Sequence, residues 1–277
     1  MNKFPFFLSL CLAAMLSAAP LRIFVTISPL VEAVTAIGGA EVEAQTLLPP
    51  GFSPESYQPN ARMLASLGKA DALLTIGVPF EKILLEKLKG AFPNLLVVDG
   101  TRGMKYRFFE DGGKDPHVWL SASNMLVYAN TVAEELCRLR PSQTEHFRAR
   151  LAAYRKSLQE ASDRNRVRLA TLKDKVVLVY HPAFGYFLEE YGIAQLAIEE
   201  EGHEPTGGTL QQSLRQARSL HVPAIFVQPQ FSPRAARTVA KELLCRVLVL
   251  DPLPTALTAG LEDLGKTISD AYSPAAE

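Results

Sequence analysis

Short apolar strands alternate with helical segments along most of this chain, and that alternation restricts the fold more than any other feature. In the first half, strands are predicted at Leu21–Thr26, Val42–Leu48, Ala72–Ile76 and Leu95–Val98, with helices at Leu30–Ile37, Ala61–Leu67 and Phe80–Leu88. Strands that are separated by helices run parallel, because the helix carries the chain back to the starting edge of the sheet. The first half therefore predicts an α/β lobe built on a parallel sheet.

The same alternation returns in the second half of the chain. Strands are predicted at Val176–Tyr180, Ile193–Ile198, Ala224–Val227 and Val247–Leu250, and helices at Ala183–Glu190, Leu210–Leu220 and Pro233 to about Leu244. Ser232 and Pro233 are typical of a helix start, as N-cap and first helical residue. A second βα lobe is therefore expected.

The segment between the two halves has a different character, since Ser142 to Leu172 contains neither glycine nor proline. Apolar side chains recur there at three- and four-residue steps, at Phe147, Leu151, Tyr154, Leu158 and Ala161. This spacing predicts one amphipathic helix of up to ~31 residues, or ~45 Å at 1.5 Å per residue. The apolar spacing is not sustained over enough heptads for a coiled coil. We expect a rigid helix (141–172) to join an N-terminal lobe (20–140) to a C-terminal lobe (173–277).

The N-terminus has the three-part layout of a secretory signal peptide. Met1–Lys3 carries one positive charge, Phe4–Leu16 is almost wholly apolar, and Ser17–Ala19 supplies small residues. The apolar run is shorter than the ~20 residues that span a bilayer. We predict that residues 1–19 are a signal peptide, cleaved after Ala19, and that the mature protein is a periplasmic monomer without a membrane anchor.

The balance of charges gives no reason to expect nucleic acid or an acidic membrane as partner, and the cysteines give none to expect a thiolate metal site. Lysine plus arginine equals aspartate plus glutamate, 29 against 29, so no overall charge attracts nucleic acid or an acidic membrane. Cys11 leaves with the signal. Cys137 and Cys245 are expected as free thiols, and the alternative is that they pair in an oxidising compartment. No CxxC motif indicates a thiolate metal site.

Four potential metal ligands lie in loops at or near strand ends. Glu55 lies in the loop after the second strand, His181 and Asp251 directly follow later strands, and His117 precedes the helix at Asn124. In parallel α/β sheets, ligands bind at the carboxyl ends of the strands. Imidazole nitrogen and carboxylate oxygen suit zinc, manganese or ferrous iron. The sequence therefore places four potential ligands of a divalent metal ion on one side of the two lobes, two from each.

Six stretches, in this order, resemble the zinc/manganese-type solute-binding proteins of metal ABC transporters. They are Leu48–Pro59 (LPPGFSPESYQP), Asp115–Ser121 (DPHVWLS), His181–Phe187 (HPAFGYF), Gly202–Thr206 (GHEPT), Gln228–Pro233 (QPQFSP) and Asp251–Leu253 (DPL). The resemblance covers nearly the whole mature chain. It implies two lobes joined by a long helix, one metal ion between them, and delivery of that ion to a membrane permease. His117, His181 and Asp251 match the family's second, third and fourth ligand positions.

The sequence departs from the family pattern at the first ligand. Family members usually carry a histidine there, in a Pro-His-x-Tyr stretch, whereas this chain has Glu55. A carboxylate in place of an imidazole shifts the donor set toward manganese or ferrous iron, and zinc also accepts carboxylates. The stretch Thr101–Lys114 is short and lacks histidine, unlike the His-rich loop of many zinc receptors of this family.

Other functions fit some of the same residues. In a zinc hydrolase, His117, His181 and Asp251 would hold the metal and Glu55 would be the base. No HExxH motif or nucleophile elbow supports that alternative. A receptor for haem or a siderophore would need a wide cleft lined by aromatic or arginine side chains. The acidic run Glu199–Glu204, which includes His203, is typical of a solvated loop, and the alternative is that it gates the cleft or attracts cations.

Overall fold

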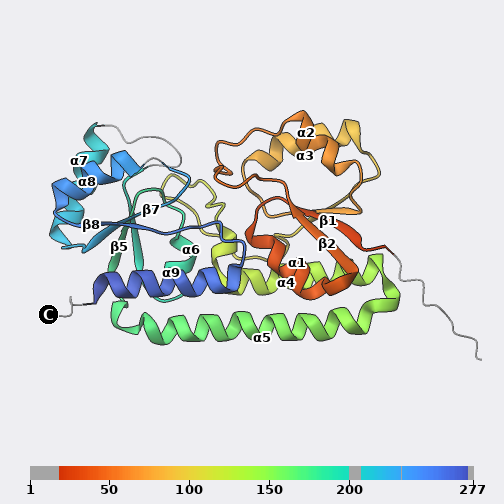
Figure 1. Ribbon diagram of the computed structural model, residues 1–277. Coiled ribbons are helices and arrows are strands. Elements are labelled where there is room, and N and C mark those ends of the chain that lie inside the picture. Colours follow the sequence, from red (N-terminus) through yellow and green to blue (C-terminus); the bar gives the residue numbers. More distant parts are fainter. Residues whose placement is uncertain (1–18, 200–206, 232, 274–277) are drawn as a thin grey trace, which may run out of the picture.

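Two α/β lobes stand side by side above one long helix in the computed structural model, which describes residues 19–199, 207–231 and 233–273 (Figure 1). Each lobe contains a four-stranded parallel sheet, with strand orders β2-β1-β3-β4 and β6-β5-β7-β8. The predicted fold class is confirmed. The predicted signal peptide, except for Ala19, and His203 lie outside the described residues.

The first lobe follows the predicted alternation closely. Its elements are β1 (Leu21–Val25), α1 (Pro29–Gly38), β2 (Val42–Thr46), α2 (Ala61–Leu67), β3 (Ala72–Thr75), α3 (Phe80–Ala91), β4 (Leu96–Asp99) and α4 (Ala122–Leu139). The central strands β1 and β3 are almost entirely buried, because helices cover both faces of a parallel sheet. Every predicted strand of this lobe agrees with the observed one to within two residues.

The second lobe repeats the arrangement after the long helix. Its elements are β5 (Val176–Val179), α6 (Gly185–Glu189), β6 (Ala194–Ala197), α7 (Gly207–Ser219), β7 (Ala224–Val227), α8 (Pro233–Leu243) and β8 (Arg246–Val249). Strand β5 pairs with both β6 and β7, so it lies inside the sheet, and its residues Val177–Val179 are fully buried. The predicted N-cap of α8, Ser232, lies outside the described residues.

The long helix forms as predicted, although it is shorter than the upper bound. Helix α5 spans Thr144–Arg168, 25 residues, with short 3₁₀ turns at Pro141–Gln143 and Ala170–Leu172. It runs beneath both lobes and packs on α1, α4 and α9 (Leu257–Tyr272) (Figure 1). The sequence analysis did not predict α9. Its buried residues Leu257, Leu261, Leu264 and Ile268 follow the helical period that could have revealed it.

A buried asparagine ties α5 to α9. The Asn165 Nδ2 group donates to the carbonyl of Leu261 at 2.7 Å, and Asn165 Oδ1 accepts from Arg168 at 2.8 Å. Gly265 makes room for this side chain, since a Cβ there would lie 2.1 Å from Asn165 Oδ1. The two helices thus meet at a point where no larger residue fits.

Hydrogen bonds between the lobes hold them together around the strand ends. The buried Trp119 Nε1 donates to the carbonyl of Pro252 at 2.7 Å, and the Tyr186 hydroxyl donates to the carbonyl of Asp115 at 3.0 Å. Glu190, just after α6, accepts from the Ser121 hydroxyl at 2.6 Å, at the start of α4. Each such bond contributes about 1 kcal/mol net, and together they fix the orientation of one lobe against the other.

Two further observations concern the cysteines and the question of a membrane-spanning helix. Cys137 and Cys245 are free thiols and partly buried, as predicted. In the ranges that the structure describes, no helix combines the length and the apolarity that crossing a bilayer requires.

Replacing Gly265 by alanine should destabilise the protein by about 1–3 kcal/mol, because the added methyl group collides with Asn165. Gly90→Ala, on the exposed side of α3 with nothing near its Cβ position, is the matched control and should stabilise by up to about 1 kcal/mol. Urea unfolding of both variants tests this. Equal effects of the two substitutions would contradict the tight α5–α9 contact.

Candidate metal centre

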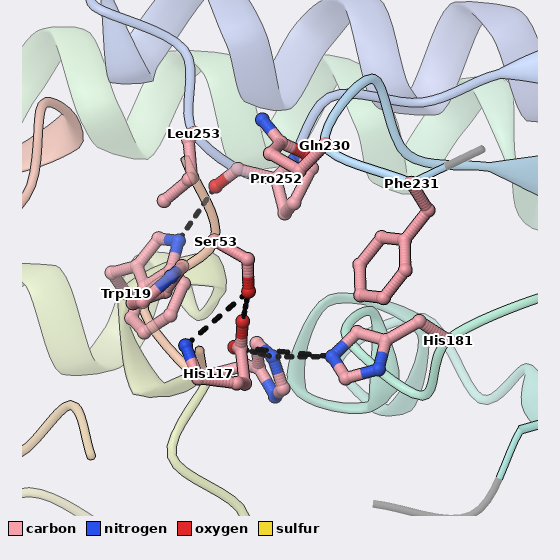
Figure 2. Close-up of a pocket in the computed structure, with 10 residues that line it drawn as sticks. Ser53, His117, Trp119, His181, Gln230, Phe231, Pro252 and Leu253 are labelled. Carbon is pink, nitrogen blue, oxygen red and sulfur yellow. Dashed lines mark hydrogen bonds and ion pairs between the residues drawn. The ribbon is translucent and has the colours of Figure 1, made fainter. Parts of the chain in front are cut away.

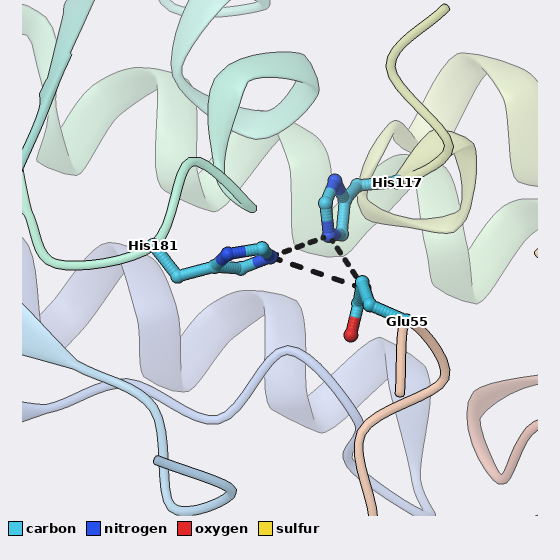
Figure 3. Close-up of side chains that lie close together, drawn as sticks. All are labelled: Glu55, His117 and His181. Atoms are coloured by element: carbon cyan, nitrogen blue, oxygen red, sulfur yellow. Dashed lines mark hydrogen bonds and ion pairs between the residues drawn. The ribbon is translucent and has the colours of Figure 1, made fainter. Parts of the chain in front are cut away.

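Three of the predicted ligands meet between the lobes (Figure 3). The His117 Nε2 atom lies 3.2 Å from Glu55 Oε1 and 3.3 Å from His181 Nε2, and His181 Nε2 lies 3.8 Å from Glu55 Oε1. Zinc bonds of about 2.0–2.1 Å in a tetrahedron place neighbouring donor atoms about 3.3 Å apart. The three atoms therefore have the spacing of ligands around one small cation.

The local chain explains how each donor reaches this point. His181 is the second residue after β5, and its backbone carbonyl accepts from Gln228 Nε2 at 2.8 Å. Glu55 lies in a turn closed by the bond from Tyr57 N to Ser53 O, 3.1 Å, and its carboxylate also contacts the Ser53 hydroxyl. His117 immediately precedes the 3₁₀ turn Val118–Leu120. Two ligands thus come from the first lobe and one from the second.

A buried carboxylate stands behind each histidine. His117 Nδ1 lies 2.8 Å from Asp115 Oδ1, and His181 Nδ1 lies 2.7 Å from Glu199 Oε2. Asp115 is 2% exposed and Glu199 is 5% exposed. A proton on each Nδ1, donated to its carboxylate, leaves the Nε2 lone pair directed at the centre of the cluster. The two histidines are thus oriented as metal ligands.

Neither carboxylate was predicted to belong to the site. The interpretation of the acidic run as a solvated loop is wrong for Glu199, because this residue is buried against His181; the rest of the run lies outside the described residues. Glu199 is the second residue after β6, so its strand-end position was the signal that could have identified it. Asp115 could have been recognised by its position two residues before His117.

The electrostatics of the cluster favour a positive charge. Burial raises the pKa of Glu55, but hydrogen bonds and charge interactions with His117 and His181 outweigh it and hold this pKa at about 2. Burial lowers the pKa of His117, but hydrogen bonds to Asp115 and Glu55 outweigh it and raise this pKa to about 9. A proton or a metal cation at this position is therefore stabilised by the surrounding carboxylates.

The fourth predicted ligand, Asp251, lies at the side of the cluster. Its carboxylate is exposed, and Oδ1 accepts from Gln230 Nε2 at 3.1 Å and from the backbone N–H of Leu253 at 2.9 Å. The structure therefore brings Glu55, His117 and His181 together. Asp251 instead accepts hydrogen bonds from Gln230 and Leu253. The neighbours Pro252 and Leu253 do line the pocket.

The pocket around the three donors is small, and aromatic and apolar side chains form much of its lining (Figure 2). Its volume is about 10 Å³, roughly that of one water-sized sphere. Phe231 stacks on the His181 ring at 4.9 Å, and the Trp119 ring lies 5.3 Å from that of His117. The sequence analysis assigned no role to Phe231 or Gln230, which both line this pocket. A single ion fits this space, whereas haem or a siderophore is far too large.

Comparisons with known proteins agree with this geometry. The family described as "Zinc-uptake complex component A periplasmic" matches residues 23–271. The metal ABC transporter substrate-binding lipoprotein FimA of Streptococcus parasanguinis is 27% identical over 243 residues, which cover 82% of this chain and 78% of FimA. The manganese ABC transporter substrate-binding lipoprotein PsaA of Streptococcus pneumoniae is 26% identical, covering 82% and 77%.

A solved structure shows the same arrangement of both lobes. The crystal structure of ZnuA has a TM-score of 0.88 and 33% sequence identity, and the match covers 92% of this chain and 100% of that one. Since the family match spans both sheets and all three clustered donors, the chain belongs to the periplasmic zinc-uptake component A family, whose members are metal-binding receptors of ABC transporters.

Proposed function

We propose that this protein captures a divalent transition-metal ion, zinc or manganese, outside the cytoplasm and delivers it to an ABC importer. The observation that carries this proposal is the convergence of Glu55, His117 and His181 from two lobes, at the spacing of metal ligands. Family membership supports it, since relatives of this chain are named as metal receptors of such importers.

Within this proposal, Glu55, His117 and His181 are ligands and Asp251 is the fourth group of the site. Glu55, together with Asp115 and Glu199 behind the histidines, supplies the negative charge that balances a divalent cation. Two imidazole nitrogens suit zinc, while the Glu55 oxygen also suits manganese and ferrous iron. The metal is cargo here, and the pocket of about 10 Å³ has the size of a single ion. We therefore propose a binding protein rather than a hydrolase.

Export and delivery complete the proposal. The predicted signal peptide, residues 1–19, would direct the chain to the periplasm, where the permease of the importer is its partner. Helix α5 runs beneath both lobes and packs on α1, α4 and α9, and buried hydrogen bonds join the lobes beside the site. Metal release should therefore need only a small, local displacement of a ligand loop, and the lobes should not rotate widely.

Replacing Glu55 by alanine should weaken zinc and manganese binding at least about tenfold. Even partners behind metal ligands contribute about 10–100-fold to affinity, and Glu55 would be a ligand itself. Isothermal titration measures the effect, with Glu145→Ala, exposed on α5, as the matched control. Unchanged affinity of Glu55→Ala would remove Glu55 from the ligand set.

Replacing Glu199 by glutamine should lower metal affinity roughly tenfold, at the lower end of the range for partners behind ligands. The amide oxygen can still accept the His181 Nδ1 proton, but the negative charge that makes the imidazole a better donor is lost. Competition with a chromophoric chelator measures this, and Glu145→Gln is the control. An affinity equal to that of the unmodified protein would show that Glu199 only fills space behind His181.

Metal binding should release about one proton at pH 7.5. Because the pKa of His117 is raised to about 9 in the metal-free protein, its ring is protonated at neutral pH and must lose that proton to bind metal. Affinity should therefore rise about tenfold per pH unit between pH 7 and pH 8.5 and level off above pH 9. Titration calorimetry in buffers of different ionisation enthalpy counts the proton. Metal binding at pH 7.5 without proton release would contradict this assignment.

A further inference from the structure

Arg107 lies behind the metal cluster, on the far side of the carboxylate that backs His117. Its Nη1 atom lies 3.9 Å from Asp115 Oδ2, while Asp115 Oδ1 accepts from the backbone N–H of His117 at 3.0 Å and lies 2.8 Å from His117 Nδ1. The buried Asp115 carboxylate is thus shared between an imidazole that faces the cluster and a guanidinium that faces away from it.

The Nη1 group of Arg107 is buried and has no hydrogen-bond partner among the described residues. The separation of 3.9 Å from Asp115 is too long for a hydrogen bond, although it is within the range of an ion pair. A buried N–H group without an acceptor calls for a physical explanation. What Arg107 supplies at this position is therefore its charge, which arginine keeps at any pH at which proteins are folded.

The second lobe holds the guanidinium in place, although Arg107 belongs to the first lobe, between β4 and α4. Its Nε atom forms an ion pair with Glu189 Oε2 at 2.5 Å, and its backbone N–H donates to the Tyr186 hydroxyl at 2.8 Å. A Cβ on Gly185 would lie 1.6 Å from Arg107 Nη1, so the guanidinium lies directly against the start of α6. Glycine at this position leaves the space that Arg107 needs to reach Asp115.

The two clustered histidines differ in this respect. Glu199 Oε2 lies 2.7 Å from His181 Nδ1, and in the described part of the chain no lysine or arginine forms an ion pair with Glu199. A carboxylate behind a ligand histidine makes the imidazole a better metal donor. The charge of Glu199 therefore acts in full on His181, whereas Arg107 offsets part of the charge that Asp115 places behind His117.

We propose that Arg107 limits the affinity of this protein for its metal ion, by offsetting the charge of Asp115, and so favours release of the ion to the importer. This inference rests on the proposed metal-binding function and adds a residue that regulates it. Arg107 acts through Asp115 and is not a ligand. Without metal, its charge stabilises a buried carboxylate, and with metal bound it repels the cation, so both effects favour the metal-free state.

Substitution of Arg107 by methionine removes the charge and keeps much of the length of the side chain. We expect Arg107→Met to raise zinc and manganese affinity about fivefold to tenfold, somewhat less than the effect of a partner directly behind a ligand, and to slow metal dissociation. Arg107→Lys keeps the charge and should bind about as tightly as the unmodified protein. Arg148→Met, which removes an exposed arginine from an ion pair on α5, is the matched control and should leave affinity unchanged.

Competition with a chromophoric chelator gives the affinities, and stopped-flow mixing of the loaded protein with excess chelator gives the dissociation rates. The ligand-field bands of bound Co²⁺ should keep their positions in Arg107→Met, because the donors stay the same. Metal-free Arg107→Met should unfold at a lower temperature than Arg107→Lys, because Asp115 loses its cation. A residue that only joined the lobes would not give tighter binding together with a less stable metal-free protein. Should Arg107→Met fail to fold, Arg107→Gln should show the same gain in affinity.

Unchanged or weaker metal binding by the folded, uncharged variant of Arg107 would overturn the inference, since Arg107 would then only join the lobes. Glu189→Gln removes the exposed partner of Arg107 but keeps the arginine charge, so it should not raise the affinity. A gain in Glu189→Gln equal to that in Arg107→Met would also overturn the inference. Either result leaves the receptor function intact, whereas failure of the unmodified protein to bind zinc, manganese and Co²⁺ would overturn the proposed function itself.

Discussion

The candidate metal site forms only while the two lobes are held in register, because neither lobe contains all three clustered donors. Glu55 and His117 come from the first lobe and His181 from the second. The bonds from Trp119 to Pro252 and from Tyr186 to Asp115 join the lobes beside these donors. A shift of about 1 Å between the lobes would move a ligand out of coordinating distance, since metal–ligand distances vary by only about 0.2 Å. Helix α5, which packs beneath both lobes, and the hydrogen bonds between the lobes thus keep the three donors at fixed distances from one another.

The second requirement is negative charge around the cation position, and carboxylates supply it at two distances from that position. Glu55 faces the cation position directly, and Asp115 and Glu199 stand one hydrogen bond behind the histidines. Buried carboxylates without a positive partner are costly, so their concentration at one point stabilises whatever cation binds there. The same carboxylates fix the tautomers of the histidines, which couples electrostatics to geometry. Selectivity among metal ions then depends on the donor atoms. Two imidazole nitrogens and at least one carboxylate oxygen form a ligand set of intermediate hardness.

Enclosure limits what the site can do. Phe231 and Trp119 lie against the two imidazoles and leave a space of about 10 Å³. An ion that loses its water in such a space is held by side chains alone, which suits capture and transfer. Catalysis would need a coordinating position that a substrate can reach. The walls of the pocket therefore suit the binding of a single ion.

The sequence by itself determined the elements and the class of site. Strand and helix periodicity located both sheets and α5, because burial on the faces of a parallel sheet leaves a local pattern in the chain. Strand-end placement, together with the family resemblance, located Glu55, His117 and His181. The tertiary structure alone decided the contacts between loops: Glu199 against His181, Phe231 over the same ring, and the Asp251 carboxylate on Gln230. These contacts join segments that are distant in sequence, so the direction of each side chain depends on how the loops pack, and no local pattern records it.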